Sequence, residues 1–407
     1  MKKTITILLA LLIISAGIFE ACRKPDDFFP ELDKTEFSEN FEGSFAAPLI
    51  DTEISLLKFI PEDESSNFWI EVDDQNLIHL RMTGENLATH PVNKIFPLYD
   101  YPLASGTEIQ IDSFDVVGEI TDLAFNNELF DGNIYLADPR IKILLNNEIP
   151  IVTYYRLDTL EMRDSDDNPI LYNEYTNYTI SAPENMGETA EDSILIDKNR
   201  VPSLPDAFFP VPSYLKLHVT IGNPEVQMLP YELTGDEAIS LNADIDIPTD
   251  LRIENLQVKD TMNFMDLSEN EGIESLSLKI KFNNGLPLGA MTQIYIADSL
   301  QSGGAGTVID SLFTDTDREG ITNEGWLLES AQTDSEGIVT SGTENFLIVT
   351  LDEERLNKLQ EQNASKLIVS TRINTYNSEA GSYVKLLSTY KLGLQIAVKL
   401  DFAIQNE

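Results

Sequence analysis

The sequence predicts an all-β protein built from two related antiparallel β-sandwich or barrel-like domains in tandem, with one short amphipathic helix. Two observations lead to this fold class. Apolar and polar residues alternate with a period of two in many short stretches, and a set of these stretches occurs twice in the same order. Alternation of this kind buries one face of a strand and exposes the other, which is typical of antiparallel sheets.

The alternation is most regular in residues 107–120 and 214–221. Turns rich in Asn, Asp, Gly and Pro separate such stretches, as expected for strands joined by hairpins and short loops. The other stretches that we expect to be strands are 68–82, 141–146, 239–247, 273–282, 345–351, 366–373 and 383–402.

Helical periodicity is clearest between Thr350 and Asn363. Thr350 and Glu353 have the spacing of a capping box, and Leu356 and Leu359 begin an apolar stripe. We expect this short helix to cover one end of a sheet. A helix that binds lipid or a partner is the alternative.

The evidence for two related domains is a repeated segment. Residues 142–151 read Lys-Ile-Leu-Leu-Asn-Asn-Glu-Ile-Pro-Ile, and residues 279–288 read Lys-Ile-Lys-Phe-Asn-Asn-Gly-Leu-Pro-Leu. Asn tolerates positive φ and bonds its own backbone, and Pro lacks a donor, so this element is expected to end one strand and redirect the chain. Further segments pair in the same order, 193–196 with 346–349 and 226–229 with 384–387. We therefore predict β-domains at 44–247 and 248–404.

Residues 1–22 have the layout of a secretory signal. Lys2 and Lys3 precede an apolar run from Ile5 to Phe19, which is shorter than the ~20 apolar residues of a spanning helix. Cys22 follows and is the only cysteine in the chain. Residues 23–43 are rich in acids, Pro and Ser, and are expected to form an acidic flexible linker.

The end of the apolar run resembles the lipobox of bacterial lipoproteins, in which Cys22 would carry a diacylglyceryl anchor. Ala21 matches the small residue of that pattern, whereas the two residues before it depart from it. Residues 23–27, Arg-Lys-Pro-Asp-Asp, resemble the export signal of Bacteroidota surface lipoproteins, with Pro25 interrupting the pattern. The resemblance implies an outer-membrane protein held by its lipid anchor and facing the cell surface. A periplasmic orientation is the alternative. The repeated β-domains are also similar to Bacteroidota surface lipoproteins. This resemblance does not indicate which activity the protein has.

The composition restricts the partners. Without the signal, 25 basic and 68 acidic residues remain, from totals of 27 and 69, which gives a net charge of -43. Such a charge repels phosphate backbones, so nucleic acid is not expected as a partner. With a single cysteine no disulfide can form within the chain, and stability must come from the burial of sheets.

No pattern of catalytic residues is present, and we predict that the protein is not an enzyme. His79, His90 and His218 have no second ligand at a metal-binding spacing, and the motifs of serine hydrolases, zinc proteases and P-loops are absent from the sequence. A glycoside hydrolase that uses two carboxylates is an alternative, although the sequence does not select the pair.

Two acidic segments resemble parts of calcium loops. Asp315, Asp317 and Glu319 occupy the first, third and fifth positions, and Gly320 follows, but Trp326 stands where the last ligand belongs. These three acids are our candidates for a calcium site outside the EF-hand class. A weaker candidate is the segment with Asp164, Asp166 and Asn168.

Four tyrosines are candidates for a ligand-binding surface. Tyr154, Tyr155, Tyr172 and Tyr175, with Tyr178 nearby, alternate with acids and Asn, a combination that suits recognition of a sugar or peptide. We favour packing of these rings on strands over a binding surface. The leading hypothesis is a non-catalytic lipoprotein that binds a glycan or an envelope protein. A protein that binds lipid or another apolar ligand is second, and a dry cavity lined by Leu, Ile and Phe would distinguish it.

Overall fold

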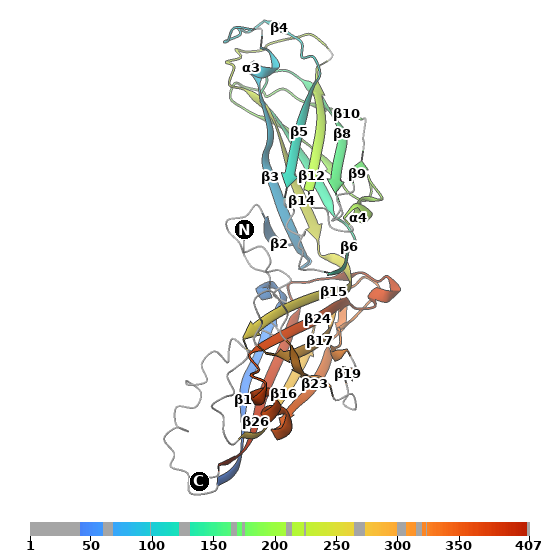
Figure 1. The fold of residues 1–407 in the computed structure, drawn as a ribbon. Coiled ribbons are helices and arrows are strands. Elements are labelled where there is room, and N and C mark those ends of the chain that lie inside the picture. The colour runs from blue at the N-terminus through green and yellow to red at the C-terminus, as the bar shows by residue number, and fades with distance from the viewer. Residues whose placement is uncertain are drawn as a thin grey trace.

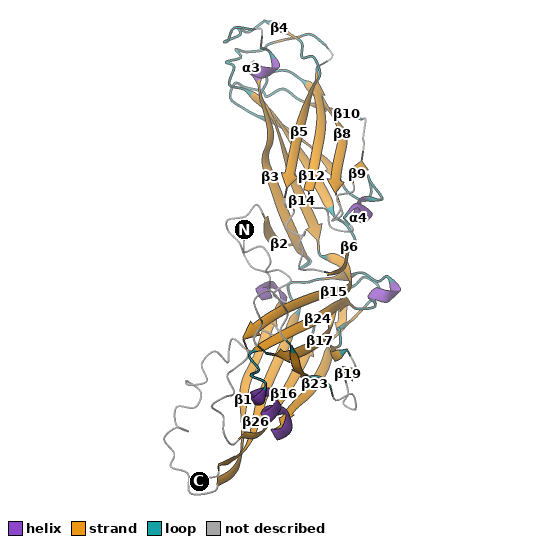
Figure 2. Cartoon of the chain, viewed as in Figure 1, coloured by secondary structure: helices purple, strands orange, loops and turns teal. Residues whose placement is uncertain are grey.

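The computed structural model describes residues 41–59, 68–97, 99–121, 131–163, 169–172, 176–208, 214–223, 225–263, 273–298, 307–314, 320–322 and 324–404. The signal, Cys22 and most of the predicted linker lie outside these ranges. The described part is mostly strand, arranged in antiparallel sheets that pack as sandwiches, which confirms the all-β fold class (Figure 2). Among the described helices, none combines the length and the hydropathy of a membrane-spanning helix.

The chain forms two sandwiches, seen one above the other in Figure 1. We call the upper one the insert sandwich. Its helices are α3 (Val92–Ile95) and α4 (Leu204–Ala207). Its strands are β2 (Phe68–Val72), β3 (Ile78–Pro91), β4 (Glu108–Ile109), β5 (Phe114–Thr121), β7 (Arg140–Asn147), β8 (Thr153–Arg163), β9 (Pro169–Tyr172), β10 (Asn177–Ile180), β11 (Ala190–Ile196), β12 (Tyr214–Gly222), β13 (Gln227–Met228) and β14 (Ala238–Pro248).

We call the lower one the host sandwich. Its helical elements are η2 (Leu56–Phe59), α5 (Glu353–Glu361) and η3 (Ser378–Ala380). Its strands are β1 (Phe41–Ser55), β6 (Asp131–Leu136), β15 (Asp250–Asn263), β16 (Ile273–Asn284), β17 (Leu288–Ala297), β18 (Val308–Ser311), β19 (Ile321–Thr322), β20 (Gly325–Leu328), β21 (Gln332–Thr333), β22 (Val339–Ser341), β23 (Thr343–Asp352), β24 (Lys366–Thr375), β25 (Val384–Lys385) and β26 (Lys391–Ile404).

The two sandwiches share one strand order. One sheet runs β11-β7-β14-β3 in the insert and β23-β16-β26-β1 in the host. The other runs β10-β8-β12-β5 in the insert and β20-β17-β24-β15 in the host. Position by position, β1 therefore corresponds to β3, and β15 corresponds to β5. Apart from η2, and from β6, which pairs with β15 of the host, the chain between β1 and β15 forms the insert sandwich.

The nesting corrects the predicted limits of 44–247 and 248–404. Residues 44–55 were expected in the first domain, but β1 pairs along its whole length with β26, from Phe41 opposite Ile404 to Ser55 opposite Lys391. The strand β6 likewise pairs with β15 of the host. The physical reason is that strand pairing ignores distance along the chain, so a strand joins the sheet whose open edge fits it.

The repeated Asn-Asn segment has the same function in both sandwiches. The Asn147 amide donates to the carbonyls of Ile151 and Ser181, and its oxygen accepts from the N–H of Ile149. In the host, the Asn284 amide donates to the backbone carbonyls of Leu288 and Glu329, and its oxygen accepts from the N–H of Leu286. Both side chains are 1% exposed. Neither residue has positive φ, so the chain is redirected by side-chain hydrogen bonds rather than by left-handed backbone.

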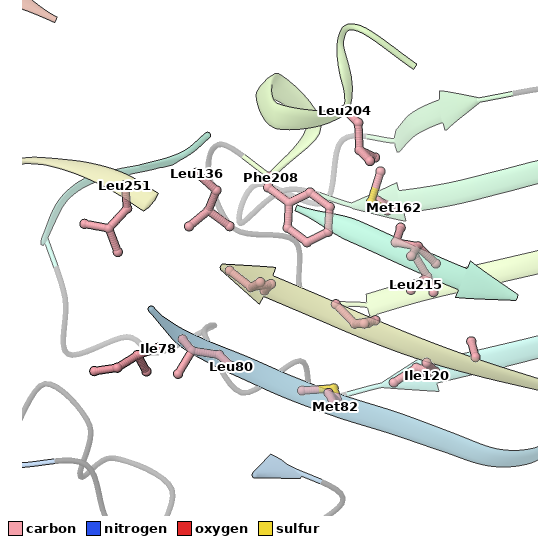
Figure 3. Close-up of a cluster of buried hydrophobic side chains, with 14 of the residues drawn as sticks. Ile78, Leu80, Met82, Ile120, Leu136, Met162, Leu204, Phe208, Leu215 and Leu251 are labelled. Carbon is pink, nitrogen blue, oxygen red and sulfur yellow. The ribbon is translucent and has the colours of Figure 1, made fainter. Parts of the chain in front are cut away.

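The core of the insert sandwich continues to the junction with the host, as Figure 3 shows. Alternate residues of β3, namely Ile78, Leu80 and Met82, point into it. Phe208, just after α4, closes the same space. Backbone hydrogen bonds also connect the two sandwiches at the junction. The N–H of Ile78 donates to the carbonyl of Leu386, and the N–H of Leu386 donates to the carbonyl of Thr249.

The predicted helix is present as α5, but it begins later than expected. The N-cap is Asp352, whose carboxylate accepts from the N–H of Arg355, rather than Thr350. The reason is that β23 continues to Asp352 and keeps Thr350 in the ladder opposite Ser277. Leu359 is buried and the helix packs against β16, β18 and β23, as expected for a cover on one end of the sandwich.

Candidate functional site

Of the four candidate tyrosines, Tyr154 and Tyr155 do not form a common binding surface. Tyr155 is 0% exposed and belongs to the core, where it stacks on Tyr178 with ring centroids 5.4 Å apart. Its hydroxyl donates to Asp192, and burial, together with that carboxylate, raises the pKa of Tyr155. Tyr154 lies on the other face of β8, against Gly222. Strand alternation separates the two rings, which is why they share no surface.

The remaining predicted site residues lie partly outside the described residues. Tyr172 ends β9 opposite Leu160, and nothing further is described of its side chain. Tyr175 and both predicted calcium segments, 164–168 and 315–319, lie outside the described ranges. Calcium binding by Asp315, Asp317 and Glu319 therefore stays a prediction.

His218 has acidic neighbours that the sequence did not suggest. The ligand atoms of Asp115, Asp158 and His218 lie within 4.8 Å of one another on the face of the β5-β12-β8 sheet. Their carboxylates already have partners, because Arg156 Nε donates to Asp158 at 2.6 Å and the Thr220 hydroxyl bonds to Asp115 at 3.1 Å. We interpret this cluster as a network of polar contacts across the sheet.

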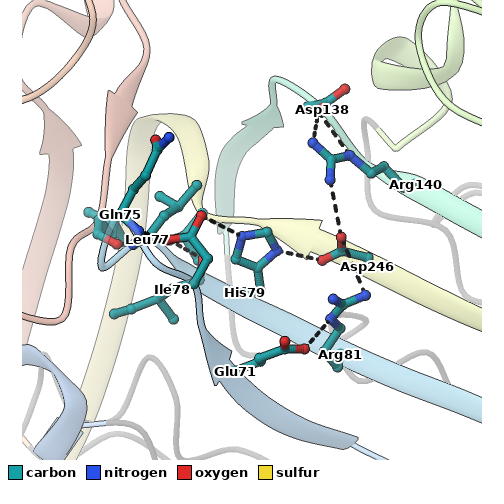
Figure 4. Close-up of polar contacts among 12 residues, drawn as sticks. Glu71, Gln75, Leu77, Ile78, His79, Arg81, Asp138, Arg140 and Asp246 are labelled. Carbon is teal, nitrogen blue, oxygen red and sulfur yellow. Dashed lines mark hydrogen bonds and ion pairs between the residues drawn. The ribbon is translucent and has the colours of Figure 1, made fainter.

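His79 belongs to a buried polar cluster beside the junction, drawn in Figure 4. Its Nδ1 lies 2.7 Å from an Asp246 oxygen, and the other Asp246 oxygen lies 3.4 Å from Arg81 and 3.5 Å from Arg140. On the other side, Nε2 lies 3.5 Å from Asp73. Burial raises the pKa of Asp73. Hydrogen bonds from the backbone N–H groups of Leu77 and Gln75, and from His79, outweigh burial, so the pKa of Asp73 is lowered. The cluster orders β3, β7 and β14 where the insert meets the host.

The most distinctive surface is the free end of the insert sandwich, which we call the distal end. It consists of the described residues of segments 92–113, 148–152, 181–189 and 223–237, which connect the strands at the end farthest from the host (Figure 1). The opposite end of the molecule carries the start of β1 and the end of β26. Any chain that enters through Phe41 therefore enters at the end remote from this surface.

Large apolar side chains are exposed at the distal end. Met228 is 69% exposed, the largest fraction among the exposed large hydrophobic residues of the described part, and Val226 is 56% exposed. The others at this end are Tyr99, Val152 and Met186. Met and aromatic residues are enriched in protein interfaces, and exposed apolar residues that gather at one place indicate a contact surface.

The same end is strongly acidic. Its four segments contain ten acids and one base, Lys94. The acids are Asp100, Glu108, Asp112, Glu148, Glu184, Glu188, Glu225, Glu232, Asp236 and Glu237, and all but Glu237 are exposed. Carboxylates thus flank the apolar residues and create a negative potential around them.

Hydrogen bonds within and between the loops hold the distal end in one shape. The side-chain amide of Gln227 pairs with both backbone groups of Val152 at 2.9 Å, in the manner of a strand. The Glu237 carboxylate accepts from Gly235 at 2.8 Å and from Thr234 at 2.9 Å. Burial raises the pKa of Glu237, but these bonds outweigh burial and lower it. The surface is therefore preorganised, which reduces the entropy lost on binding.

Sequence reasoning missed this surface for a physical reason. Residues 226–229 were recognised as part of the repeat, opposite 384–387, and were assigned a structural role on that basis. In the host, Val384 is buried, whereas Val226 is exposed. Val226 and Val384 occupy the same position in the repeat, but the residues around them differ. The sequence shows the acids of these loops and does not show which apolar residues are exposed.

No protein-family model matches the chain, and no curated protein matches it. Among solved structures, a candidate secreted protein from Parabacteroides distasonis aligns with 88% of this chain and 99% of its own, with 14% identity and a TM-score of 0.43. The CBM22-1-CBM22-2 tandem domain of Xyn10C from Paenibacillus barcinonensis aligns with 83% of this chain and 99% of its own, with 7% identity and a TM-score of 0.16. PNGase F, a glycosylasparaginase from Flavobacterium meningosepticum, aligns with 77% of this chain and 96% of its own, with 10% identity and a TM-score of 0.15. At these TM-scores the similarities carry no argument about activity.

Proposed function

We propose that this chain is a non-catalytic binding protein of the bacterial outer membrane, anchored through Cys22, that contacts a basic protein with its distal end. The observation that carries the proposal is the cluster of exposed Met, Val and Tyr side chains among ten acids, at the end of the molecule remote from Phe41. A protein partner is favoured over a glycan because Val226 and Met228 offer apolar contact area, and the flanking carboxylates complement a positive surface.

The anchor and the distal end fit this arrangement. Eighteen residues separate Cys22 from Phe41, and an extended chain of that length spans at most about 60 Å at ~3.3 Å per residue. The body can thus stand away from the membrane with the insert sandwich outermost. The strong negative charge also keeps the body from lying on an anionic lipid surface.

The proposal is tested by photo-cross-linking in cells that produce the protein. A photoreactive amino acid replaces Met228 in one variant and Phe346 in the control, because Phe346 is also exposed but lies on the host sandwich. The expected result is one protein adduct, identified by mass spectrometry, from position 228 and not from position 346. The purified partner should bind the chain, with weaker binding at higher salt, and Val226→Ser/Met228→Ser should weaken binding at least tenfold.

Two outcomes contradict the proposal. Saturable binding to a glycan array that the Val226→Ser/Met228→Ser variant retains would support a glycan site elsewhere. Equal adducts from positions 228 and 346 would indicate nonspecific contact. The anchor is tested separately with Cys22→Ser, which should move the protein from the membrane fraction to the soluble fraction.

A further inference from the structure

The host sandwich contains a cavity of about 90 Å³ between its two sheets. The wall is mostly apolar and includes three aromatic rings, with Phe282 and Trp326 at a centroid distance of 5.2 Å and Phe313 beside Trp326 at 6.2 Å. Leu278, Ile280 and Ile294 complete the main part of the wall. Tightly packed interiors leave few voids larger than a water molecule, so a space of this size needs an explanation.

The insert sandwich shows why the space exists. Because Asn147 and Asn284 occupy the same place, Tyr155 on β8 corresponds to Thr292 on β17. In the insert, Tyr155 pairs with Ile221 of β12, and both are fully buried. In the host, Thr292 pairs with Thr371 of β24. A large ring and a branched aliphatic chain are thus replaced by two threonines, and both line the cavity.

The polar atoms of the wall already have partners. The hydroxyls of Thr292 and Thr371 lie 3.2 Å apart and bond to each other. The amide of Asn284 donates to two carbonyls. Among the described residues, the buried polar atoms that lack a partner all belong to residues outside this wall. The cavity therefore offers no unsatisfied donor or acceptor, and an occupant needs only apolar surface.

We propose that this cavity binds the end of an alkyl chain. Its volume is smaller than that of the ~150 Å³ engineered cavity that holds benzene, which favours a thin chain over a ring. Leu278, Ala290 and Leu312 of the wall are only half-buried, so the space is not sealed and the rest of the chain has a way out. This site is independent of the distal end and of the proposed function.

The experiment follows the fluorescence of Trp326, which lines the cavity. The protein has two tryptophans, so the chain from residue 23 onward with Trp69→Phe reports on Trp326 alone. It is titrated with 12-bromododecanoic acid, whose bromine quenches a neighbouring indole. We expect saturable quenching at micromolar concentrations. The control carries Trp326→Phe, and its remaining Trp69 should show no saturable quenching.

A filled variant makes the test specific. Thr292→Ile/Thr371→Ile removes both hydroxyls together and adds a methylene at each site, with β-branched residues that suit a strand. It should weaken the quenching at least tenfold while the unfolding midpoint stays the same or rises. If the double variant fails to fold, Thr371→Ile is tested alone, because the insert has Ile221 at this position. This variant should weaken the quenching threefold or more. Absence of saturable quenching of Trp326, or equal affinity in a folded filled variant, overturns the proposal.

Discussion

Asn147 and Asn284 show how much one buried side chain can specify. Each amide satisfies two carbonyls and one N–H at the point where a strand ends and the chain crosses to the opposite sheet. The repeated Asn-Asn segment could be predicted as a structural redirection, because Asn bonds to nearby backbone. The sequence could not show that the second carbonyl partner, Ser181 or Glu329, comes from a distant loop.

Replacing Asn284 by Ala should destabilise the host sandwich by about 2–4 kcal/mol, because the carbonyls of Leu288 and Glu329 and the N–H of Leu286 would be buried without partners. The matched control is Asn283→Ala, whose side chain is exposed and whose loss should cost less than ~0.5 kcal/mol. Urea unfolding followed by Trp326 fluorescence measures both. Similar costs for the two variants would contradict the assigned role of the buried amide.

At the level of elements, local patterns predicted the strands and the helix better than their ends. The helix was expected to begin at Thr350 because the Thr350–Glu353 spacing matches a capping box. The ladder to β16 extends β23 through Asp352, so tertiary pairing moved the cap by two residues. Tyr154 and Tyr155 are separated for a local reason, since the alternation that predicted β8 also places them on opposite faces.

The position of the cap can be measured. Asp352→Ala should cost about 1 kcal/mol, in the range of 0.5–2 kcal/mol for lost N-caps, because the N–H of Arg355 loses its acceptor. Thr350→Ala should cost less, since its hydroxyl bonds only to the Ser277 hydroxyl in a half-buried position. The comparison uses chemical unfolding of both variants, and a larger cost for Thr350→Ala would return the cap to the position that the sequence suggested.

At the level of the whole molecule, the repeat predicted two related domains but not their nesting. The two sets of segments occur in the same order, which suggested tandem units. The first strand of the host has no motif that links it to β26, and it lies directly before the insert in the chain. Phe41 and Ile404, which pair, are the first and last described residues, and single-sequence patterns report only local structure.

Nesting predicts which fragments fold. Residues 68–249 should fold alone, because both insert sheets are formed from within this range. Residues 250–407 should aggregate, because without β1 the edge of β26 is open. The same fragment should become soluble and cooperative in unfolding when residues 41–55 are supplied as a peptide or fused to its C-terminus. Circular dichroism and sedimentation check this outcome, and a monomeric, folded 250–407 fragment would favour the tandem division.

The insertion of one sandwich within another gives the insert at least two covalent connections to the host, at β1 and at β15, where a tandem protein has one. A pull on the outermost loops is divided between the chain entering after β1 and the chain leaving through β15, so neither crossing bears the whole load. A single proteolytic cut in either crossing leaves the outer body attached by the other. At the cell surface that we propose for this protein, the duplicated connection limits the damage that shear or a single proteolytic cut can cause.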